Sequence, residues 1–299
     1  MSREAASAAH AKIGGEQGFY RALGPEHSVL FVEGGSTLLV TFENLDHVAD
    51  TGADRLPWGH SFVTGQGWSM LGLMAHGWTW YRDEAVFDFF DELRDDGFFA
   101  RFDRVVFYGA SMGGYAAATF AAAAPGATVI AISPQATLSR DVAPWETRYH
   151  RVWRRDFSAR SRYAYAPDGA ASAERAYLFF DPASPLDAMH AALFRSLPVE
   201  RYHCRRMGHR IASLWLGMGI LKPVITDCVE QRLTPLGFHR YLRKRRESSR
   251  YERQLLDAVE ARGRPDLVAR TCRAVLARRR GPRFRRALKE AEDALRAKS

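Results

Sequence analysis

A serine near the middle of the sequence has the surroundings of a catalytic nucleophile. Residues 104–124 read RVVFYGASMGGYAAATFAAAA, which places Ser111 in a G-x-S-x-G motif between a β-branched and aromatic segment and an alanine-rich one. A strand, this motif and a helix form a nucleophile elbow, in which the serine lies on a sharp turn that projects its hydroxyl group. Gly109 and Gly113 would let the strand and the helix cross closely. The motif therefore predicts that Ser111 is a nucleophile.

The same turn has two other interpretations, a phosphate-binding loop and a strand-to-helix turn that only packs well. A dinucleotide-binding turn requires G-x-G-x-x-G, and a P-loop requires G-x-x-x-x-G-K-[ST]. The segment GASMGG fits neither pattern, and no lysine follows it. Phosphate binding is therefore disfavoured, while a turn with a purely structural role remains the alternative to the nucleophile.

The elbow resembles that of the α/β-hydrolase superfamily. This resemblance implies a catalytic triad in the chain order Ser, Asp or Glu, His. It also implies a lid after the strand that follows the elbow helix, a position that residues 135–175 occupy. Over residues 28–215 the chain is also similar to bacterial hydrolase-like proteins, some of them associated with surface-polysaccharide and glycoprotein biosynthesis. This second likeness is carried by Asn44, Trp80-Tyr81, Ser133-Pro134 and the pair Asp181 and Asp187.

A serine nucleophile needs a base, and the superfamily order places a histidine after it in the chain. His209 follows a glycine just beyond the strand expected at 199–205, as the superfamily's catalytic histidine often does. A loop or helix-capping histidine is the alternative interpretation. His203 lies within that strand and is expected to be structural, and His60 and His76 precede the serine. We expect His209 to be the base.

Two aspartates could orient that histidine. Asp181 ends the strand expected at 176–180, close to where the superfamily places its acid. Asp187 lies six residues further on and could equally reach the histidine, or simply cap the following helix. The sequence favours Asp181 over Asp187, and a site that uses neither is the third alternative.

The oxyanion of an acyl-transfer reaction needs preorganised N–H donors. One would be the backbone N–H of Met112, the residue after the nucleophile. The second is expected from the loop after an early strand, here Asn44-Leu45, although the lipase-type HGGG sequence is absent there. No H-E-x-x-H or similarly close ligand spacing is present, so neither a catalytic metal nor another cofactor is expected.

Alternating strands and helices would position these residues. Segments 28–34 and 36–44 are expected to form an antiparallel hairpin at a sheet edge, although the run Leu38-Leu39-Val40 indicates burial on both faces. After residue 68 the alternation predicts a mostly parallel sheet with helices on both faces, an α/β fold. The further strands are expected at 68–75, 105–108, 127–133, 176–180 and 199–205, and the helices at 82–96, after Ser111 and at about 185–196.

The expected domains are a lead-in at 1–27, an α/β-hydrolase-like domain at 28–222 with the lid-like insertion, and a basic helical extension at 223–299. Residues 240–299 hold 20 Lys and Arg against 8 Asp and Glu, whereas the rest of the chain holds 23 against 26. The net charge of +9 therefore belongs to the extension. Its runs at 240–246 and 278–286 could dock an acidic partner, and nucleic-acid binding is not expected because no recognised motif accompanies them.

The cysteines and the apolar runs bear on the compartment. Cys204, Cys228 and Cys272 are far apart and form no C-x-x-C pair, which is typical of a reducing compartment. No run reaches the roughly 20 apolar residues of a membrane span, and the first residues contain no secretory h-region. We expect a cytoplasmic protein.

Together these features predict a serine-dependent esterase or acyl hydrolase that acts on a small-molecule or glycan ester. An acyltransferase would use the same triad with an alcohol in place of water. A non-catalytic binding or scaffold protein that keeps the elbow is the alternative from another class. The arginines of the insertion could favour an anionic or sugar-bearing substrate or form a solvated surface; they are Arg140, Arg148, Arg151, Arg154, Arg155, Arg160 and Arg162.

Overall fold

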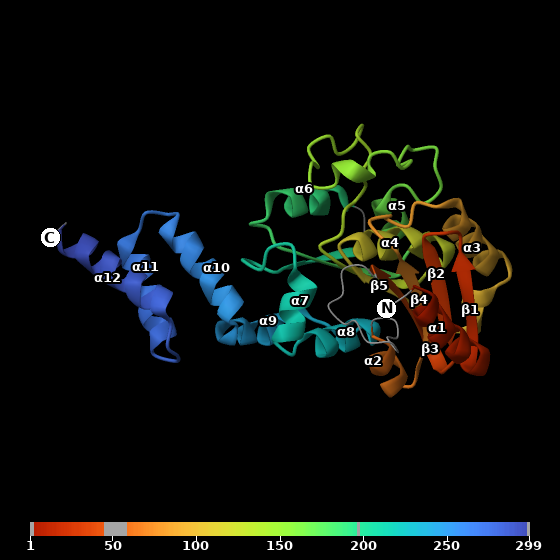
Figure 1. Cartoon of the computed structure of the whole chain (residues 1–299), viewed down its shortest axis with the longest axis horizontal. Helices are drawn as coiled ribbons and strands as arrows, with labels where there is room; N and C mark the ends of the chain where they lie inside the picture. Colours follow the sequence, from red (N-terminus) through yellow and green to blue (C-terminus); the bar gives the residue numbers. More distant parts are fainter. Residues whose placement is uncertain (1–2, 45–58, 196–197, 298–299) are drawn as a thin grey trace.

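The computed structural model describes residues 3–44, 59–195 and 198–297, and these residues form an eight-stranded sheet with helices on both faces (Figure 1). The strand order is β1-β2-β4-β3-β5-β6-β7-β8. The strands are β1 (Gly18–Leu23), β2 (His27–Val32), β3 (Gly35–Asn44), β4 (Trp68–Ala75), β5 (Arg104–Ala110), β6 (Thr128–Ile132), β7 (Arg175–Phe180) and β8 (Val199–His203).

Strands β3 to β8 run parallel to one another, and β2 runs antiparallel to both of its neighbours, β1 and β4. This order and direction confirm the predicted α/β-hydrolase-like fold. The central strand β3 is buried on both faces, because Leu38, Leu39 and Val40 are all fully buried. Parallel strands covered by helices on both sides have such continuous apolar runs.

The predicted hairpin between 28–34 and 36–44 is wrong. Strand β2 pairs with β1 and β4, and β4 separates it from β3. Gly34 and Gly35, where β3 begins, allow a close approach to the chain at the start of β4 and do not form a hairpin turn. A Cβ atom on Gly34 would lie 2.5 Å from the carbonyl oxygen of Trp68, and Gly35 donates its N–H to the carbonyl of Gly67.

Residues 1–27 are not a loose lead-in where the structure describes them. They contain α1 (Arg3–Gln17) and β1, which forms the hairpin with β2 through Gly24, a residue with φ of +63°. Helix α1 has no apolar stripe of the period that marks an amphipathic helix, so the sequence pattern gave no signal for it.

Helices α3 and α4 follow the predicted pattern most closely. Helix α3 begins after the N-cap Asp83, whose side chain accepts a hydrogen bond from the N–H of Ala85, and Gly97 follows its end with φ of +68°.

The helices that cover the sheet are α2 (His60–Gly65), α3 (Glu84–Asp95), α4 (Met112–Phe120), α5 (Ala166–Ala171), α6 (Pro185–Leu193), α7 (Ile211–Gly217), α8 (Leu221–Val229) and α9 (Pro235–Leu242).

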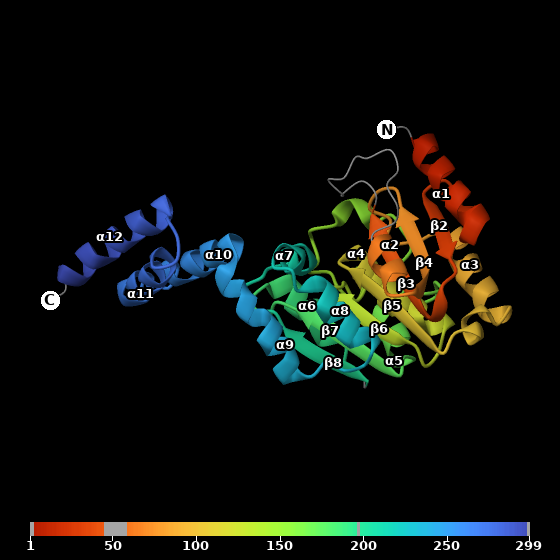
Figure 2. The same cartoon turned by 90° about the horizontal axis from the view of Figure 1, so that it is seen from below.

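The C-terminal region divides differently from the prediction, which began the extension at residue 223. Helices α8 and α9 belong to the sheet domain, since Val224, Phe238 and Leu242 share a core with β6 and β7. Three further helices, α10 (Ser249–Glu260), α11 (Pro265–Leu276) and α12 (Pro282–Arg296), have their own small core and stand away from the sheet (Figures 1 and 2).

Within the described part of the chain, no single helix has both the length and the apolarity of a membrane span. Helices α7 and α8 meet that test only when they are taken together, and they are bent by 113° relative to each other.

Residues 135–175 connect β6 to β7 mainly through loops, and charged contacts fasten them to the domain. Arg82, which precedes α3, donates to the carbonyl oxygens of Asp156, Arg162 and Tyr163. Arg155 pairs with Glu26. Arg162 of the insertion pairs with Asp88 of α3, so at least two of its arginines anchor it to the domain, an outcome that the solvated-surface interpretation did not include.

Candidate active site

Ser111 occupies the turn between β5 and α4 in a strained backbone conformation. Its φ of +55° and ψ of −118° lie in a region that residues with a side chain seldom adopt. A Cβ atom on Gly109 would lie 2.1 Å from the carbonyl oxygen of Gly113, and one on Gly113 would lie 2.5 Å from that of Phe42. The two glycines are thus required by the close crossing of strand and helix, as the motif predicts.

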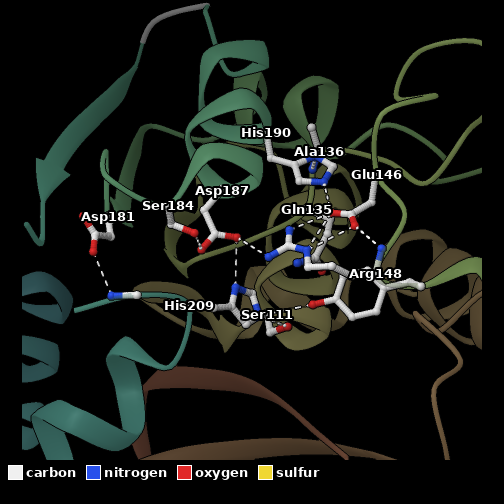
Figure 3. A network of polar contacts seen from close by, with 12 residues as sticks. Ser111, Gln135, Ala136, Glu146, Arg148, Asp181, Ser184, Asp187, His190 and His209 are labelled. Atoms are coloured by element: carbon white, nitrogen blue, oxygen red, sulfur yellow. Dashed lines mark hydrogen bonds and ion pairs between the residues drawn. The ribbon is translucent and has the colours of Figure 1, made fainter. Parts of the chain in front are cut away.

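The structure brings Ser111, His209 and Asp187 into one hydrogen-bonded line (Figure 3). Nε2 of His209 lies 2.8 Å from Oγ of Ser111, and Nδ1 of His209 lies 3.0 Å from Oδ1 of Asp187. Ser111 comes from the elbow, His209 from the loop between β8 and α7, and Asp187 from the first turn of α6. Residues separated by up to 98 positions therefore converge on one proton-transfer path.

Asp181, which the sequence favoured as the partner of His209, does not contact the imidazole ring. Its Oδ2 accepts the backbone N–H of Gly208 at 2.8 Å, and its Oδ1 accepts that of Ala183 at 2.9 Å. The carboxylate at the strand end is used to hold the backbone of the histidine loop. The preference for Asp181 is corrected to Asp187, which lies six residues further along the chain, in the first turn of α6.

The surroundings of Asp187 keep it ionised. Its side chain is fully buried, and burial alone would raise its pKa, but hydrogen bonds and charge from His209 and Arg148 lower the pKa to about 2. Oδ2 also accepts the hydroxyl of Ser184 at 2.9 Å. An ionised carboxylate only accepts hydrogen bonds, so Nδ1 of His209 carries a proton and Nε2 is free to receive one.

Two residues of the insertion belong to the site, and sequence reasoning assigned them no role there. Nη1 of Arg148 lies 2.7 Å from Oδ1 of Asp187, and the hydroxyl of Tyr149 lies 3.3 Å from Nε2 of His209. Arg148 is one of several arginines in this insertion, and nothing in its local sequence sets it apart. No spacing rule connects Arg148 or Tyr149 with Ser111, because their positions depend on how the insertion docks.

An aromatic cluster adjoins the triad at Tyr149. The ring of Tyr149 lies 4.6 Å from that of Trp80 and 5.4 Å from that of Trp78, measured between ring centroids. Trp80 is fully buried, whereas Trp78 is 45% exposed. Burial raises the pKa of Tyr149 despite the opposing charge of Arg148, so the phenol is protonated at neutral pH. The cluster offers a flat apolar surface next to a hydrogen-bond donor.

The expected oxyanion donors are placed as follows. Met112 is the first residue of α4, and the first N–H groups of a helix have no acceptor within it. Phe42 pairs with Gly109 in the parallel register of β3 and β5, so the backbone of Asn44 ends β3 at the level of Ser111. Leu45 and the side chain of Asn44 lie outside the described residues.

Two other histidines that the structure describes, His203 and His27, lie apart from this line. His203 ends β8 and packs edge-on against the ring of Phe180. His27 is buried beside the hydroxyl of Thr79 at 2.8 Å. Among the residues that the structure describes, no three His, Cys, Asp or Glu side chains are grouped as metal ligands would be.

Comparisons with known proteins add likenesses of fold. No protein-family model matches the sequence, and no curated protein is similar to it. The structure is similar to the capsule O-acetyltransferase of Neisseria meningitidis serogroup A, at 13% identity over 69% of this chain and 96% of that one, with a TM-score of 0.45. It is also similar to a hyperthermophilic esterase from Pyrobaculum calidifontis, at 15% identity over 76% and 91%, with a TM-score of 0.45.

A third similar structure is the Glycosylation Associate Protein (Gap123) complex from Streptococcus agalactiae. The identity is 16% over 68% of this chain and 44% of that one, with a TM-score of 0.46. At such identities and scores, a likeness assigns neither a family nor a chemistry to this chain. Its function has to be inferred from its own site.

Proposed function

We propose that the chain is a serine-dependent acyl hydrolase that cleaves an ester through Ser111, His209 and Asp187. The observation that carries the proposal is the continuous line of hydrogen bonds from Ser111 Oγ through both nitrogens of His209 to a buried, ionised carboxylate. The strained elbow supports it, because backbone strain of this kind concentrates at functional sites. The proposal adopts Asp187 as the acid.

In the first half of the reaction, Nε2 of His209 takes the proton of the Ser111 hydroxyl as its oxygen attacks the ester carbonyl carbon. The N–H of Met112 would donate to the oxyanion that forms. Asp187 accepts the Nδ1 proton and stabilises the imidazolium without becoming protonated itself. When the tetrahedral intermediate collapses, the proton on Nε2 passes to the departing alkoxide, which leaves as the alcohol. An acyl group then remains on Ser111.

In the second half, water gives its proton to Nε2 of His209 while its oxygen attacks the acyl carbon. The carboxylic acid leaves, and the proton returns to Ser111 Oγ. If an alcohol took the place of water, it would accept the acyl group, and the product would be a new ester and not a free acid. The same residues serve hydrolysis and transfer, so acyl transfer is the second candidate function. Tyr149 does not distinguish the two reactions, because its hydroxyl could donate to the departing oxygen in either of them.

We further propose a small-molecule or glycan ester as the substrate class and the cytoplasm as the compartment. An exposed Trp78 beside the triad supports a substrate with a flat or sugar-like face. The compartment is supported by three cysteines that are buried and unpaired, Cys204, Cys228 and Cys272.

We also propose that the basic extension docks an acidic partner. Some arginines of the C-terminal unit pair with its own acids, as Arg278 and Arg279 do with Glu252. Others are exposed and form no ion pair with any described residue, among them Arg285 and Arg286 of α12 and, in the segment η5 (Arg243–Glu247), Lys244 and Arg246. An exposed, uncompensated run of this kind suits a partner of opposite charge.

Labelling with a fluorophosphonate probe tests the enzymatic proposal. The wild-type chain should be labelled at Ser111, and labelling should be lost in Ser111→Ala and His209→Ala. Ser158→Ala is a matched control, because Ser158 is exposed on the insertion and should leave labelling unchanged. Folded wild type that takes no label would favour a binding role, and labelling that survives in Ser111→Ala would exclude the proposed nucleophile.

A panel of short-chain aryl esters then separates hydrolysis from transfer. Release of the free acid in water alone supports the hydrolase. Faster ester consumption with added sugar or alcohol, together with an acylated product, would support the acyltransferase.

A further inference from the structure

Asp187 accepts two hydrogen bonds at the same oxygen. His209 Nδ1 lies 3.0 Å and Arg148 Nη1 lies 2.7 Å from Oδ1 (Figure 3). The guanidinium is a permanent positive charge close to the imidazole that has to become positive during proton transfer. A nearby positive charge disfavours protonation of a histidine. Arg148 alone would therefore weaken the base that the triad needs.

A second carboxylate, that of Glu146, holds the other side of Arg148. Nε of Arg148 lies 3.1 Å from Oε1 and 3.0 Å from Oε2, and Nη2 lies 2.6 Å from Oε2. The backbone N–H of Arg148 also donates to Oε1 at 2.8 Å. The side chain of Glu146 is fully buried. A two-pronged pair of this geometry fixes the plane of the guanidinium as well as its position.

His190 completes the surroundings of Glu146. Its Nδ1 accepts the backbone N–H of Ala136 at 3.2 Å, so its Nε2 carries the proton and donates to Oε2 of Glu146 at 3.0 Å. His190 is then neutral, and burial lowers its pKa against the pull of Glu146. Burial would raise the pKa of Glu146, but hydrogen bonds from His190 and Arg148 and the charge of Arg148 lower it to about 2.

These assignments fix the charge of the cluster at neutral pH. Asp187 and Glu146 are negative, Arg148 is positive, and His190 is neutral. The cluster carries one net negative charge while His209 is neutral and none when His209 is protonated. Without Glu146, the ion pair of Asp187 and Arg148 would already be neutral and would attract an imidazolium only weakly.

We propose that Arg148 and Glu146 are positioning residues that act as a pair on Asp187. Arg148 fixes the orientation of the Asp187 carboxylate, and Glu146 cancels the charge of Arg148, so that His209 keeps the attraction of a full negative charge. Neither residue touches a reacting atom. The inference rests on the proposed function, because it assigns both residues a part in proton transfer from Ser111.

Other charged and titratable groups also surround His209. Asp181 accepts the backbone N–H of Gly208, and Tyr149 and His190 lie near the triad. The histidine loop itself carries Arg205, Arg206 and Arg210. The charge of Arg245 acts on Cys204 in the same loop. The variants below leave all of them in place, so a change can be attributed to the pair.

Four variants of the full chain separate orientation from charge: Arg148→Met, Glu146→Gln, the double variant and Arg148→Lys. Arg151→Met is the matched control, since Arg151 is an exposed arginine of the same insertion. Two quantities are measured against pH. One is the rate of fluorophosphonate labelling, and the other is the titration of the His209 ring by NMR, assigned with His209→Ala. Thermal unfolding of each variant checks that it is folded.

The expected shifts have opposite signs. In Arg148→Met the midpoint of His209 titration rises by on the order of one pH unit, because two carboxylates remain without the cation. In Glu146→Gln the midpoint falls, because the cation is no longer compensated. In the double variant it returns to the wild-type value, as it does in Arg148→Lys, which keeps the charge.

The labelling rate at its high-pH plateau reports orientation. It should fall by about tenfold or more in Arg148→Met, in the double variant and in Arg148→Lys, because each loses the forked contact that fixes Asp187. Arg151→Met should match the wild type in both measurements. A normal plateau in Arg148→Met and Arg148→Lys would overturn the orienting role.

Single-variant midpoints that stay at the wild-type value or move in the same direction would overturn the charge compensation. If Glu146→Gln does not fold, Arg148→Met and the double variant still test the charge compensation, because the midpoint of the His209 titration should shift in Arg148→Met and stay at the wild-type value in the double variant. If wild type shows no labelling that depends on Ser111, the proposed function fails. The NMR titration then still tests the charge pairing, so the two failures are distinguishable.

Discussion

Replacing Asp187 by asparagine should slow the reaction far more than the same replacement of Asp181. The amide keeps the size of the carboxylate, and its oxygen can still accept from His209 and Arg148. Its NH₂ group would face the hydroxyl of Ser184, which can turn to accept a hydrogen bond. The substitution therefore removes mainly the charge.

The size of the effect follows from the distance between the charges. With about 4 Å between the charge centres and an effective dielectric constant of about 20, imidazolium and carboxylate attract each other by about 4 kcal/mol. Loss of that attraction in the transition state corresponds to a rate decrease of about 10³-fold. Among the described residues, the Asp181 carboxylate accepts hydrogen bonds only from the backbone N–H groups of Gly208 and Ala183, so Asp181→Asn should slow the reaction less than about tenfold.

The assay is the second-order rate constant of fluorophosphonate labelling, together with kcat/KM for an aryl acetate, on both variants at the same pH. Circular dichroism and thermal unfolding confirm that each is folded. Equal rate losses in the two variants, or a larger loss in Asp181→Asn, would refute the assignment of Asp187 as the partner of His209.

Three more outcomes are expected. Gly113→Ala should destabilise the fold by about 2 kcal/mol or more, as measured by unfolding in urea, because its Cβ would lie 2.5 Å from a carbonyl oxygen of β3. Gly217→Ala is the control and should have a small effect on the unfolding midpoint, because there is open space around Gly217. Tyr149→Phe should lower kcat/KM less than about tenfold, because a neutral hydrogen bond contributes about 1 kcal/mol; a larger loss would make its hydroxyl essential to the chemistry of His209. Asp187 has a pKa of about 2 in the folded chain, below its ordinary value of 3.8, so its stabilising effect is complete above about pH 4 and is lost as the pH falls through about 2. The free energy of unfolding should therefore fall over that range by on the order of 2 kcal/mol more in wild type than in Asp187→Asn, as measured by urea titration at each pH.

Local patterns in the sequence were sufficient for the elbow and for most of the sheet. The strained turn at Ser111 is set by glycines two residues to either side, and the strands from β4 to β7 contain continuous apolar runs. Strand pairing at the other edge could not be obtained in this way. The glycines between β2 and β3 signal a close backbone approach, and only the structure shows that the approaching chain is β4 and that no hairpin forms there.

The acid of the triad shows a second limit. A carboxylate at the end of β7 is the nearer choice by sequence, but Asp181 is engaged by backbone N–H groups. Asp187 reaches the ring because α6 begins at Pro185, after a short turn that follows β7, and its first turn faces His209. A difference of six residues is decided by where a helix begins, and that boundary is among the least certain features of a sequence pattern.

The insertion between β6 and β7 is more than a cover over the serine. It supplies Arg148 to the acid and Tyr149 to the base, and both depend on a segment with little regular structure. Arg82 binds backbone carbonyl oxygens of this segment. The geometry of the triad is therefore coupled to the docking of the insertion, since a segment that moved away would take Arg148 from Asp187 and leave a buried carboxylate with one partner fewer. Control of the site through the insertion would then act on the base itself as well as on access to the serine.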